Sequence, residues 1–175
     1  MTGAPVLETA RLTLRPFRAS DVGAQAAMMA DVQVMRHLGG QPLPREDSWR
    51  KLLCGAGLWP LFGYGYWAVE RRADGVMIGQ VGFADFKRGI EPAIEDIPEM
   101  GWLFAAEASG QGYATEAGRA ALDWIDSALG PAQVAAIIDA ANAPSIRVAE
   151  KLGFGAREEA RYRGEPILLF RRKRA

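Results

Sequence analysis

Two glycines separated by one residue stand three residues before the clearest helical pattern of this chain, in the stretch SGQGYAT, residues 109–115. Glycine is a poor helix former, and it is favoured where the backbone needs a positive φ or must approach another group closely. The apolar stretch EMGWLFA (99–105) precedes these residues, and a run with helical periodicity follows at 115–129. The sequence therefore predicts a glycine loop that joins a strand to a helix.

The residues after this helix complete a strand–helix–strand unit. Gly130 and Pro131 end the helix, and VAAII (134–138) is a short apolar run, typical of a strand covered on both faces. Two strands joined by a helical crossover are parallel. By contrast, the turn residues Asp74-Gly75 predict an antiparallel hairpin.

The remaining elements surround this unit. We expect strands at 11–17, 66–71, 76–83, 156–162 and 167–172, and helices at 21–30, at 31–38, after Pro44 and at 144–152. The sequence thus predicts one mixed α/β domain, residues 1–175, with helices flanking a mostly antiparallel sheet that contains one parallel pair.

Composition excludes several classes of function. Lys plus Arg and Asp plus Glu number 21 each, so no overall charge favours nucleic acid or an anionic membrane. One cysteine, Cys54, and one histidine, His37, argue against a zinc site, any other metal site or a disulfide framework. We expect Cys54 to be buried and His37 to cap a helix. Without a leader or a membrane-spanning apolar run, a cytoplasmic protein is predicted.

The glycine loop itself indicates an anion site. Unpaired amides and the helix dipole at a helix N-terminus favour negative charge, although a tight turn without ligand would need the same glycines. A nucleotide-hydrolysing P-loop requires a lysine after its last glycine, and Tyr113 and Ala114 stand there instead.

Two other anionic ligands fit the loop. Gly110-x-Gly112-x-x-Thr115, with Asp139 after the next strand, approaches a dinucleotide-binding pattern, so an oxidoreductase is one alternative. However, only about 35 residues follow Asp139, too few for such a fold. The other ligand is coenzyme A, whose amide-bearing arm can pair with strand backbone.

The whole chain resembles the GNAT superfamily of N-acetyltransferases, in particular its branch of ribosomal-protein N-terminal acetyltransferases (RimJ/RimL-like). The resemblance is carried by ETARLTLRPFRASD (8–21), YWAVERRADGVMIGQVGF (66–83), EMGWLF (99–104) followed by SGQGYATEA (109–117), and NAPSIRVAEKLGF (142–154). The chain departs from such relatives at Ser109, at Pro144 and in the short hairpin that contains GEP (164–166).

This resemblance implies a GNAT-like fold whose parallel strands splay apart to admit acetyl-CoA as co-substrate. The residues expected to contact the coenzyme are Trp102, Leu103, Phe104, Ser109, Gly110, Gln111, Gly112, Tyr113, Ala114, Thr115, Asn142 and Ser145. A homodimer is also implied by the resemblance alone. A third interpretation is a non-catalytic module that binds coenzyme A.

Two residues are candidates for catalysis. An amine acceptor must lose a proton before it attacks a thioester, and Glu99 begins the coenzyme strand within an acidic stretch that would attract a cation. Ser145 could donate to the departing sulfur, or it could only cap its helix. We expect direct transfer in a ternary complex to a primary amine, either a protein N-terminus or a small, possibly cationic, molecule.

Overall fold

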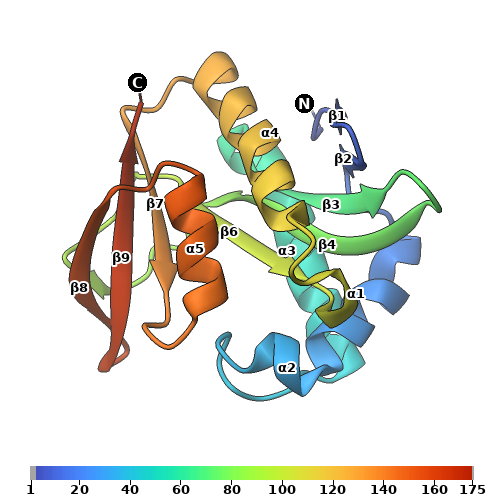
Figure 1. The fold of residues 1–175 in the computed structure, drawn as a ribbon, viewed down its shortest axis with the longest axis horizontal. Coiled ribbons are helices and arrows are strands. Elements are labelled where there is room, and N and C mark those ends of the chain that lie inside the picture. The colour runs from blue at the N-terminus through green and yellow to red at the C-terminus, as the bar shows by residue number, and fades with distance from the viewer. Residues whose placement is uncertain (1–2, 175) are drawn as a thin grey trace.

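One nine-stranded sheet organises the residues that the computed structural model describes, 3–174 (Figure 1). The strands are β1 (Leu7–Glu8), β2 (Leu12–Arg15), β3 (Tyr66–Arg71), β4 (Val76–Ala84), β5 (Ile90–Glu91), β6 (Glu99–Phe104), β7 (Gln133–Ile138), β8 (Ala156–Tyr162) and β9 (Glu165–Lys173). The α-helices are α1 (Val22–Ala30), α2 (Val32–Met35), α3 (Arg45–Phe62), α4 (Tyr113–Ala128) and α5 (Ala143–Lys151).

The strand order places the predicted strand–helix–strand unit at the centre of the sheet. From edge to edge the order is β1-β2-β3-β4-β6-β7-β9-β8-β5, and within residues 3–174 β6 and β7 form the one parallel pair. This arrangement confirms the predicted mixed α/β class. The two-residue strands β1 and β5 are not predicted by the sequence, because two residues show no periodicity.

The parallel pair is joined at one end and open at the other. Glu99 pairs with Ala135, and the Ala135 N–H donates to the carbonyl of Pro98 at 3.0 Å. Beyond this point the two strands diverge toward their carboxyl ends, as Figure 1 shows. Because β6 stays paired with β4 along its length, only its edge toward β7 lacks a strand partner.

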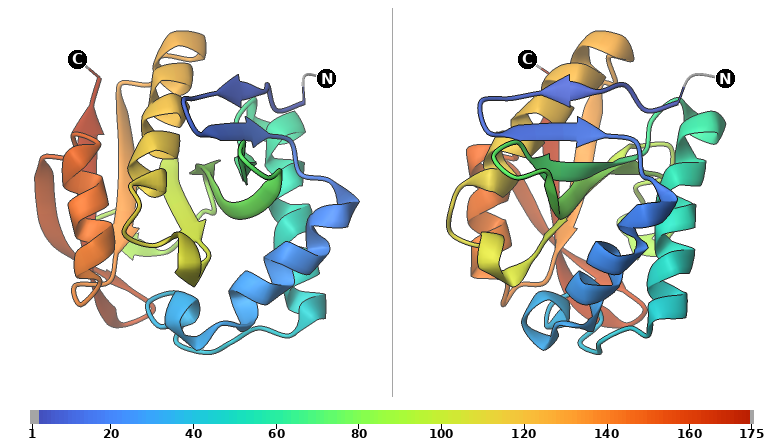
Figure 2. Two further views of the ribbon diagram at one scale, coloured as in Figure 1. Left: turned by 45° about the vertical axis from the view of Figure 1, so that its right-hand side comes forward. Right: turned by 90° about the vertical axis from the view of Figure 1, so that its right-hand side faces the viewer.

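Helices cover both faces of the sheet: α4 and α5 lie on one, α1 and α3 on the other (Figure 2). Helix α4 buries Ala117, Ala121 and Ile125 against the sheet, as its apolar stripe predicts. The helical periodicity at 115–129 also predicts Leu129 on this stripe, but Leu129 is 50% exposed, because α4 ends at Ala128 and Leu129 leaves the helical path with φ −122°.

Two further expectations about helices are wrong in detail. Helix α4 begins at Tyr113, two residues earlier than predicted, because Gly112 in the left-handed region (φ +80°) turns the chain directly into it. In α3, the sequence predicts that Leu52 and Leu53 both face the core, whereas Leu52 is buried and Leu53 is 49% exposed. Consecutive residues of a helix point about 100° apart, so Leu53 lies outside the face that Leu52 buries.

Within residues 3–174 the structure contains no helix that is both long enough and apolar enough to cross a membrane.

Candidate functional site

Unpaired backbone amides line the start of α4. The first backbone hydrogen bond of this helix runs from Glu116 N–H to the carbonyl of Gly112. In the described part of the chain, none of the N–H groups of residues 110–115 has a hydrogen-bond acceptor, and no side chain caps the helix. Six successive amides at the positive end of a 16-residue helix form a site for an anion.

The two glycines of the loop give this anion site its shape. Gly110 and Gly112 have φ of +74° and +80°, which other residues adopt only with strain. A Cβ added to Gly110 would meet no atom within 4 Å, so space lies directly over the backbone there. The positive φ values therefore explain why glycine is needed, as the sequence predicts, and the open space leaves room for a ligand.

A cleft of about 480 Å³ extends from these amides along β6 to the start of α5. Among the residues predicted to bind a coenzyme, those that line the cleft are Trp102, Leu103, Phe104, Ser109, Gly110, Gly112, Tyr113, Ala114, Thr115, Asn142 and Ser145. Gln111 does not line the cleft, because its side chain donates back to the carbonyl of Glu107 at 2.7 Å. Glu99 does not line the cleft either.

The charges around this cleft are all positive. Arg36, Arg147 and Lys151 line it, and the lining contains no aspartate or glutamate. The chain as a whole has balanced charge, so this asymmetry is local. An anionic ligand would therefore be attracted to the cleft over its whole length. Sequence reasoning missed these three cations, since they come from α5 and from the turn after α2.

Strand β6 presents only part of its backbone to the gap between β6 and β7. The Ala105 N–H donates to Ile78 on the β4 side, whereas the carbonyl of Pro98 accepts from β7. Because backbone groups alternate in direction along a strand, those of Trp102 and Phe104 face the gap and those of Leu103 face β4. Leu103 can line the cleft without offering hydrogen bonds to a ligand.

Ser145 lies beside β6 with its hydroxyl proton available. Its oxygen accepts from the indole Nε1 of Trp102 at 3.3 Å. The helix cap is Asn142, whose side-chain oxygen accepts from the Ser145 N–H at 3.2 Å, so Ser145 itself does not cap α5. A hydroxyl that already accepts one hydrogen bond can donate its own proton to a ligand atom.

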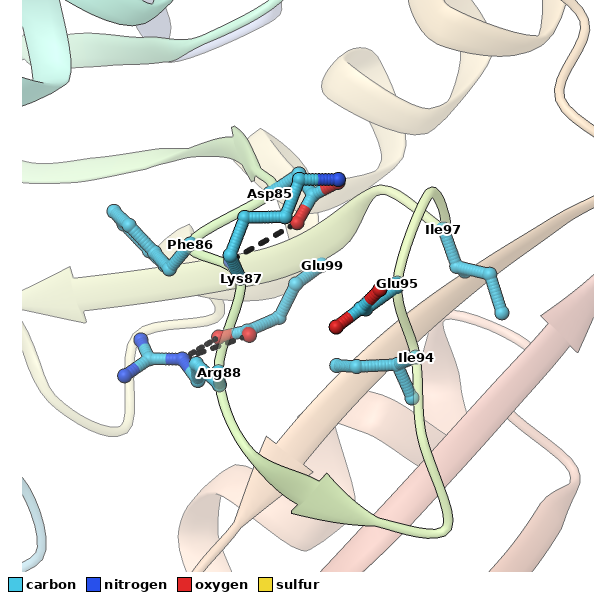
Figure 3. A pocket seen from close by; sticks show the side chains of 8 residues that line it. All are labelled: Asp85, Phe86, Lys87, Arg88, Ile94, Glu95, Ile97 and Glu99. Atoms are coloured by element: carbon cyan, nitrogen blue, oxygen red, sulfur yellow. Dashed lines mark hydrogen bonds and ion pairs between the residues drawn. The ribbon is translucent and has the colours of Figure 1, made fainter.

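Glu99 lies at the joined end of β6 and β7, in a separate small hollow (Figure 3). Its side chain is 6% exposed, and the Nε of Arg88 donates to both oxygens at 2.9 and 3.2 Å. Burial raises the pKa of Glu99, Arg88 works in the opposite direction and Asp85 adds to the rise. Glu99 is therefore a partly desolvated carboxyl whose charge is balanced by one arginine.

His37 of the turn after α2 pairs with Asp139, the residue that follows β7. The His37 Nδ1 lies 2.7 Å from Asp139 Oδ2, and His37 is among the residues that line the cleft. Two hydrogen bonds lower the pKa of Asp139, the larger effect coming from the Ala141 N–H and the smaller from His37. The expected capping role of His37 is wrong, because α2 ends at Met35 and the ring turns toward β7. Cys54, expected to be buried, is exposed.

The outer side of the glycine loop is held by the segment before β2. Glu116 accepts from the Thr9 hydroxyl at 2.6 Å and from the Arg11 Nε at 2.7 Å. Arg11 also donates to the carbonyl of Gln111 at 3.0 Å and lies 4.5 Å from the ring centre of Tyr113. These contacts turn the loop carbonyl outward and leave the amides facing the cleft.

Comparison with known proteins identifies the family. Residues 11–155 match the profile of the Acetyltransferase (GNAT) domain. The chain belongs to the GNAT acetyltransferase family. Its sequence is 36% identical to the uncharacterised Bacillus subtilis (strain 168) protein YkkB over 114 residues, 64% of this chain and 63% of that protein. It is 30% identical to the B. subtilis N-acetyltransferase YoaA, itself uncharacterised, over 86% of this chain and 82% of that one.

Solved structures agree with this GNAT assignment. A Bordetella pertussis protein described as a GNAT-family acetyltransferase is 31% identical and superposes with a TM-score of 0.84, covering 97% of this chain and 99% of its own. An acetyltransferase from Agrobacterium tumefaciens strain C58 is 30% identical, with a TM-score of 0.82 over 99% and 97% of the two chains. The predicted GNAT-like fold is thereby confirmed.

A GNAT fold removes the dinucleotide-binding alternative. A dinucleotide-binding fold needs a sheet of several parallel strands, whereas the described sheet contains one parallel pair. The acid expected to bind a ribose, Asp139, is held by His37. The ribosomal-protein acetyltransferase RimL superposes with a TM-score of 0.75 at 17% identity, which shows a shared fold and does not place this chain in that branch.

Proposed function

We propose that this GNAT protein, as one domain over residues 1–175, transfers the acetyl group of acetyl-CoA to a primary amine. Transfer is direct, within a ternary complex of enzyme, acetyl-CoA and amine. The observation that carries the proposal is the row of six unpaired amides at the start of α4, opening into a cleft without acidic residues. The RimJ/RimL branch, a homodimer and a cytoplasmic location remain predictions from the resemblance and the composition.

The residues present fit coenzyme A. Its diphosphate needs donors and positive potential, which residues 110–115 and the dipole of α4 supply. Gly110 leaves open space above the backbone for a phosphate oxygen. The cations Arg36, Arg147 and Lys151 balance the remaining phosphate charge. RimL and the aminoglycoside acetyltransferase AAC(6')-Ib, structural neighbours of this chain, were both solved in complex with coenzyme A.

The acyl end of the ligand would lie between β6 and β7. The backbone groups of Trp102 and Phe104 face this gap and can pair with an amide-bearing arm as a neighbouring strand would. The predicted backbone contacts are therefore reduced to Trp102 and Phe104, because the backbone N–H and C=O of Leu103 face β4. Asn142 and Ser145 bound the inner end, where the Ser145 hydroxyl can donate to the departing sulfur.

Glu99 is proposed to accept the proton of the amine, directly or through a water molecule. Its partly desolvated carboxyl has a raised pKa, which brings it closer to the range that suits a general base. The Arg88 guanidinium opposes this rise and favours the ionised carboxylate, the form that can accept a proton. For the amine to reach Glu99, the hollow around this carboxyl must open, since Arg88 and the segment that follows β4 cover it (Figure 3).

The acceptor is proposed to be a protein N-terminus or a small-molecule amine. The acidic stretch, residues 91–107, attracts a cation less than its composition predicts. The reason is that Arg88 neutralises Glu99 and Lys87 pairs with Asp96 at 2.8 Å. Glu91 and Glu95 stay exposed. YoaA, a relative that covers most of the chain, is described as an N-acetyltransferase, which favours nitrogen as the acceptor atom.

Release of free thiol from acetyl-CoA in the presence of short peptides, polyamines, aminoglycosides and amino acids tests the proposal. At least one amine should accelerate release. The matched variants Gly110→Ala and Gly75→Ala introduce the same strain at φ of +74° and +71°, both into open space, but only Gly110 lines the cleft.

Only Gly110→Ala should weaken acetyl-CoA binding, by at least tenfold, in calorimetry. Binding without thiol release by any amine would identify a non-catalytic module. Absence of both would refute the proposed function.

A further inference from the structure

A tyrosine on β3 reaches across a glycine of β4 to a glycine of β6. Tyr66 pairs with Gly82 on β4, and Gly82 pairs with Gly101 on β6. Residues opposite one another on neighbouring strands project from the same face of the sheet. Because neither glycine has a side chain, the Tyr66 ring can extend along this row from β3 to β6.

The Tyr66 hydroxyl lies against the bare backbone of Gly101. A Cβ added to Gly101 would collide with the hydroxyl oxygen of Tyr66, whereas the ring atom Cζ would be 3.2 Å away. Within the described residues the hydroxyl has no hydrogen-bond partner, and Tyr66 is only partly buried. A hydroxyl without a partner in the protein can donate its proton to a ligand.

Tyr66 and Glu99 occupy the same side of β6. Glu99 precedes Gly101 by two residues, and side chains two apart on a strand share a face. Trp102 projects from the opposite face, where its indole contacts Ser145 of α5. Burial and the negative charge of Glu99 raise the pKa of Tyr66, with Arg88 opposing. The phenol therefore keeps its proton near neutral pH and can donate it in a hydrogen bond.

We propose that the Tyr66 hydroxyl is a catalytic hydrogen-bond donor to the carbonyl oxygen of the acetyl group, an inference that rests on the proposed function. Two atoms gain negative charge during acyl transfer, the carbonyl oxygen and the sulfur. Ser145 is available to the sulfur from the α5 face. The carbonyl oxygen needs a donor too, and Tyr66 is a neutral donor that lies against Gly101 of β6 on the Glu99 face.

The step balances without any further reactant. The nitrogen lone pair of the amine bonds to the acetyl carbon, and the C=O π pair moves onto oxygen, where the Tyr66 O–H stabilises it. The oxygen pair then re-forms C=O, and the C–S bond breaks with its pair on sulfur. One proton passes from nitrogen to Glu99, and the thiolate takes up one proton from solvent, either directly or through the Ser145 hydroxyl, which regains its own proton from solvent. Tyr66 ends the step unchanged.

Tyr66→Phe removes this donor and keeps the ring. The measurement is thiol release from acetyl-CoA, with the amines that the wild-type enzyme uses and, without amine, with water as acceptor. We expect kcat to fall about 100-fold, while acetyl-CoA affinity and melting temperature stay unchanged. The control is Tyr64→Phe, a partly buried tyrosine whose ring stacks on Phe62 at 5.5 Å, and it should act as wild type.

Gly101→Ala gives an independent test, because its methyl group displaces the Tyr66 hydroxyl from β6. Alone it should reduce kcat about as much as Tyr66→Phe, and in the Tyr66→Phe background it should cost less than threefold. Three results would each overturn the inference. The reductions in kcat of the two single variants could multiply in the double variant, or Tyr66→Phe could keep the wild-type kcat. The fall in kcat of Tyr66→Phe could also be accompanied by an equal loss of acetyl-CoA affinity. Those results leave the proposed function intact, whereas an inactive wild-type enzyme refutes both.

Discussion

Arg88 donates from a single nitrogen, Nε, to both carboxylate oxygens of Glu99, and the paired carboxylate is almost completely enclosed. Burial disfavours the charged carboxylate, and the guanidinium favours it. The pKa of Glu99 is raised because burial outweighs the arginine. The protonation state of the proposed base is thus set by two opposed effects that mutation can separate.

Glu99→Gln should lower kcat by about 100-fold at pH 7, since an amide cannot take up the proton of the amine. Affinity for acetyl-CoA should change little, because Glu99 does not line the coenzyme cleft.

A raised folded-state pKa means that the contribution of Glu99 to stability is lost as pH rises through that pKa. Urea unfolding should accordingly show that the variant loses less stability than wild type between pH 4 and pH 7.

Arg88→Met should move the acidic limb of the kcat/KM profile to higher pH. Removing the guanidinium leaves burial and Asp85 to raise the pKa of Glu99 without opposition. Rates measured from pH 5 to pH 9 would show the shift, with Arg157→Met, an exposed residue on β8, as control. An unshifted limb in Arg88→Met would mean that the titrating group is not Glu99.

The cations of the cleft should contribute to coenzyme binding through charge. Arg147→Gln combined with Lys151→Gln should weaken coenzyme A binding about tenfold in calorimetry and should make the affinity less sensitive to salt. The matched change Arg119→Gln, on the exposed face of α4 and outside the cleft, should alter neither quantity. Equal salt dependence in all three proteins would argue against an anionic ligand in this cleft.

Asp21 should be needed for stability rather than for activity. Its carboxylate accepts from both terminal nitrogens of Arg15, at 2.8 and 2.9 Å, and both side chains are 6% exposed. Despite its burial, the hydrogen bonds from Arg15 and the Arg18 N–H lower the pKa of Asp21. Asp21→Asn should therefore cost about 3 kcal/mol in urea unfolding at pH 7.

The pH dependence of the same unfolding experiment checks this interpretation. A lowered folded-state pKa means that the contribution of Asp21 is present above its ordinary value of 3.8 and is lost as pH falls through the folded-state pKa. The difference between wild type and Asp21→Asn should thus narrow in acid. As a control, Asp123→Asn changes an exposed residue of α4 and should leave stability unchanged both at pH 7 and in acid.

The sequence alone predicts the parts of the fold that have a local signal. The glycine loop, the periodicity of α4 and the apolar run of β7 together specify the central parallel pair. Boundaries next to glycine are less predictable, since the left-handed Gly112 allows α4 to begin at Tyr113. Leu53 illustrates a second limit, because an apolar residue beside a core position can still face solvent.

Contacts between distant segments explain why the site could be predicted only in part. The coenzyme residues are neighbours in sequence, so a motif reveals them. Arg88 and Tyr66 reach the neighbourhood of Glu99 from other elements, and no pattern near residue 99 indicates either one. The pairing of Arg11 with Glu116 likewise joins residues 105 positions apart. Such partners become visible only when the sheet is assembled.

The central claim is that the amides of residues 110–115 hold the diphosphate of coenzyme A. Amide chemical shifts of the ¹⁵N-labelled protein, recorded during titration with coenzyme A, test it most directly. We predict that the largest shifts occur at residues 110–115, with smaller changes at Trp102, Phe104 and Asn142. Saturating coenzyme A that leaves the amides of residues 110–115 unshifted, or shifts mainly residues outside the cleft, would contradict the account.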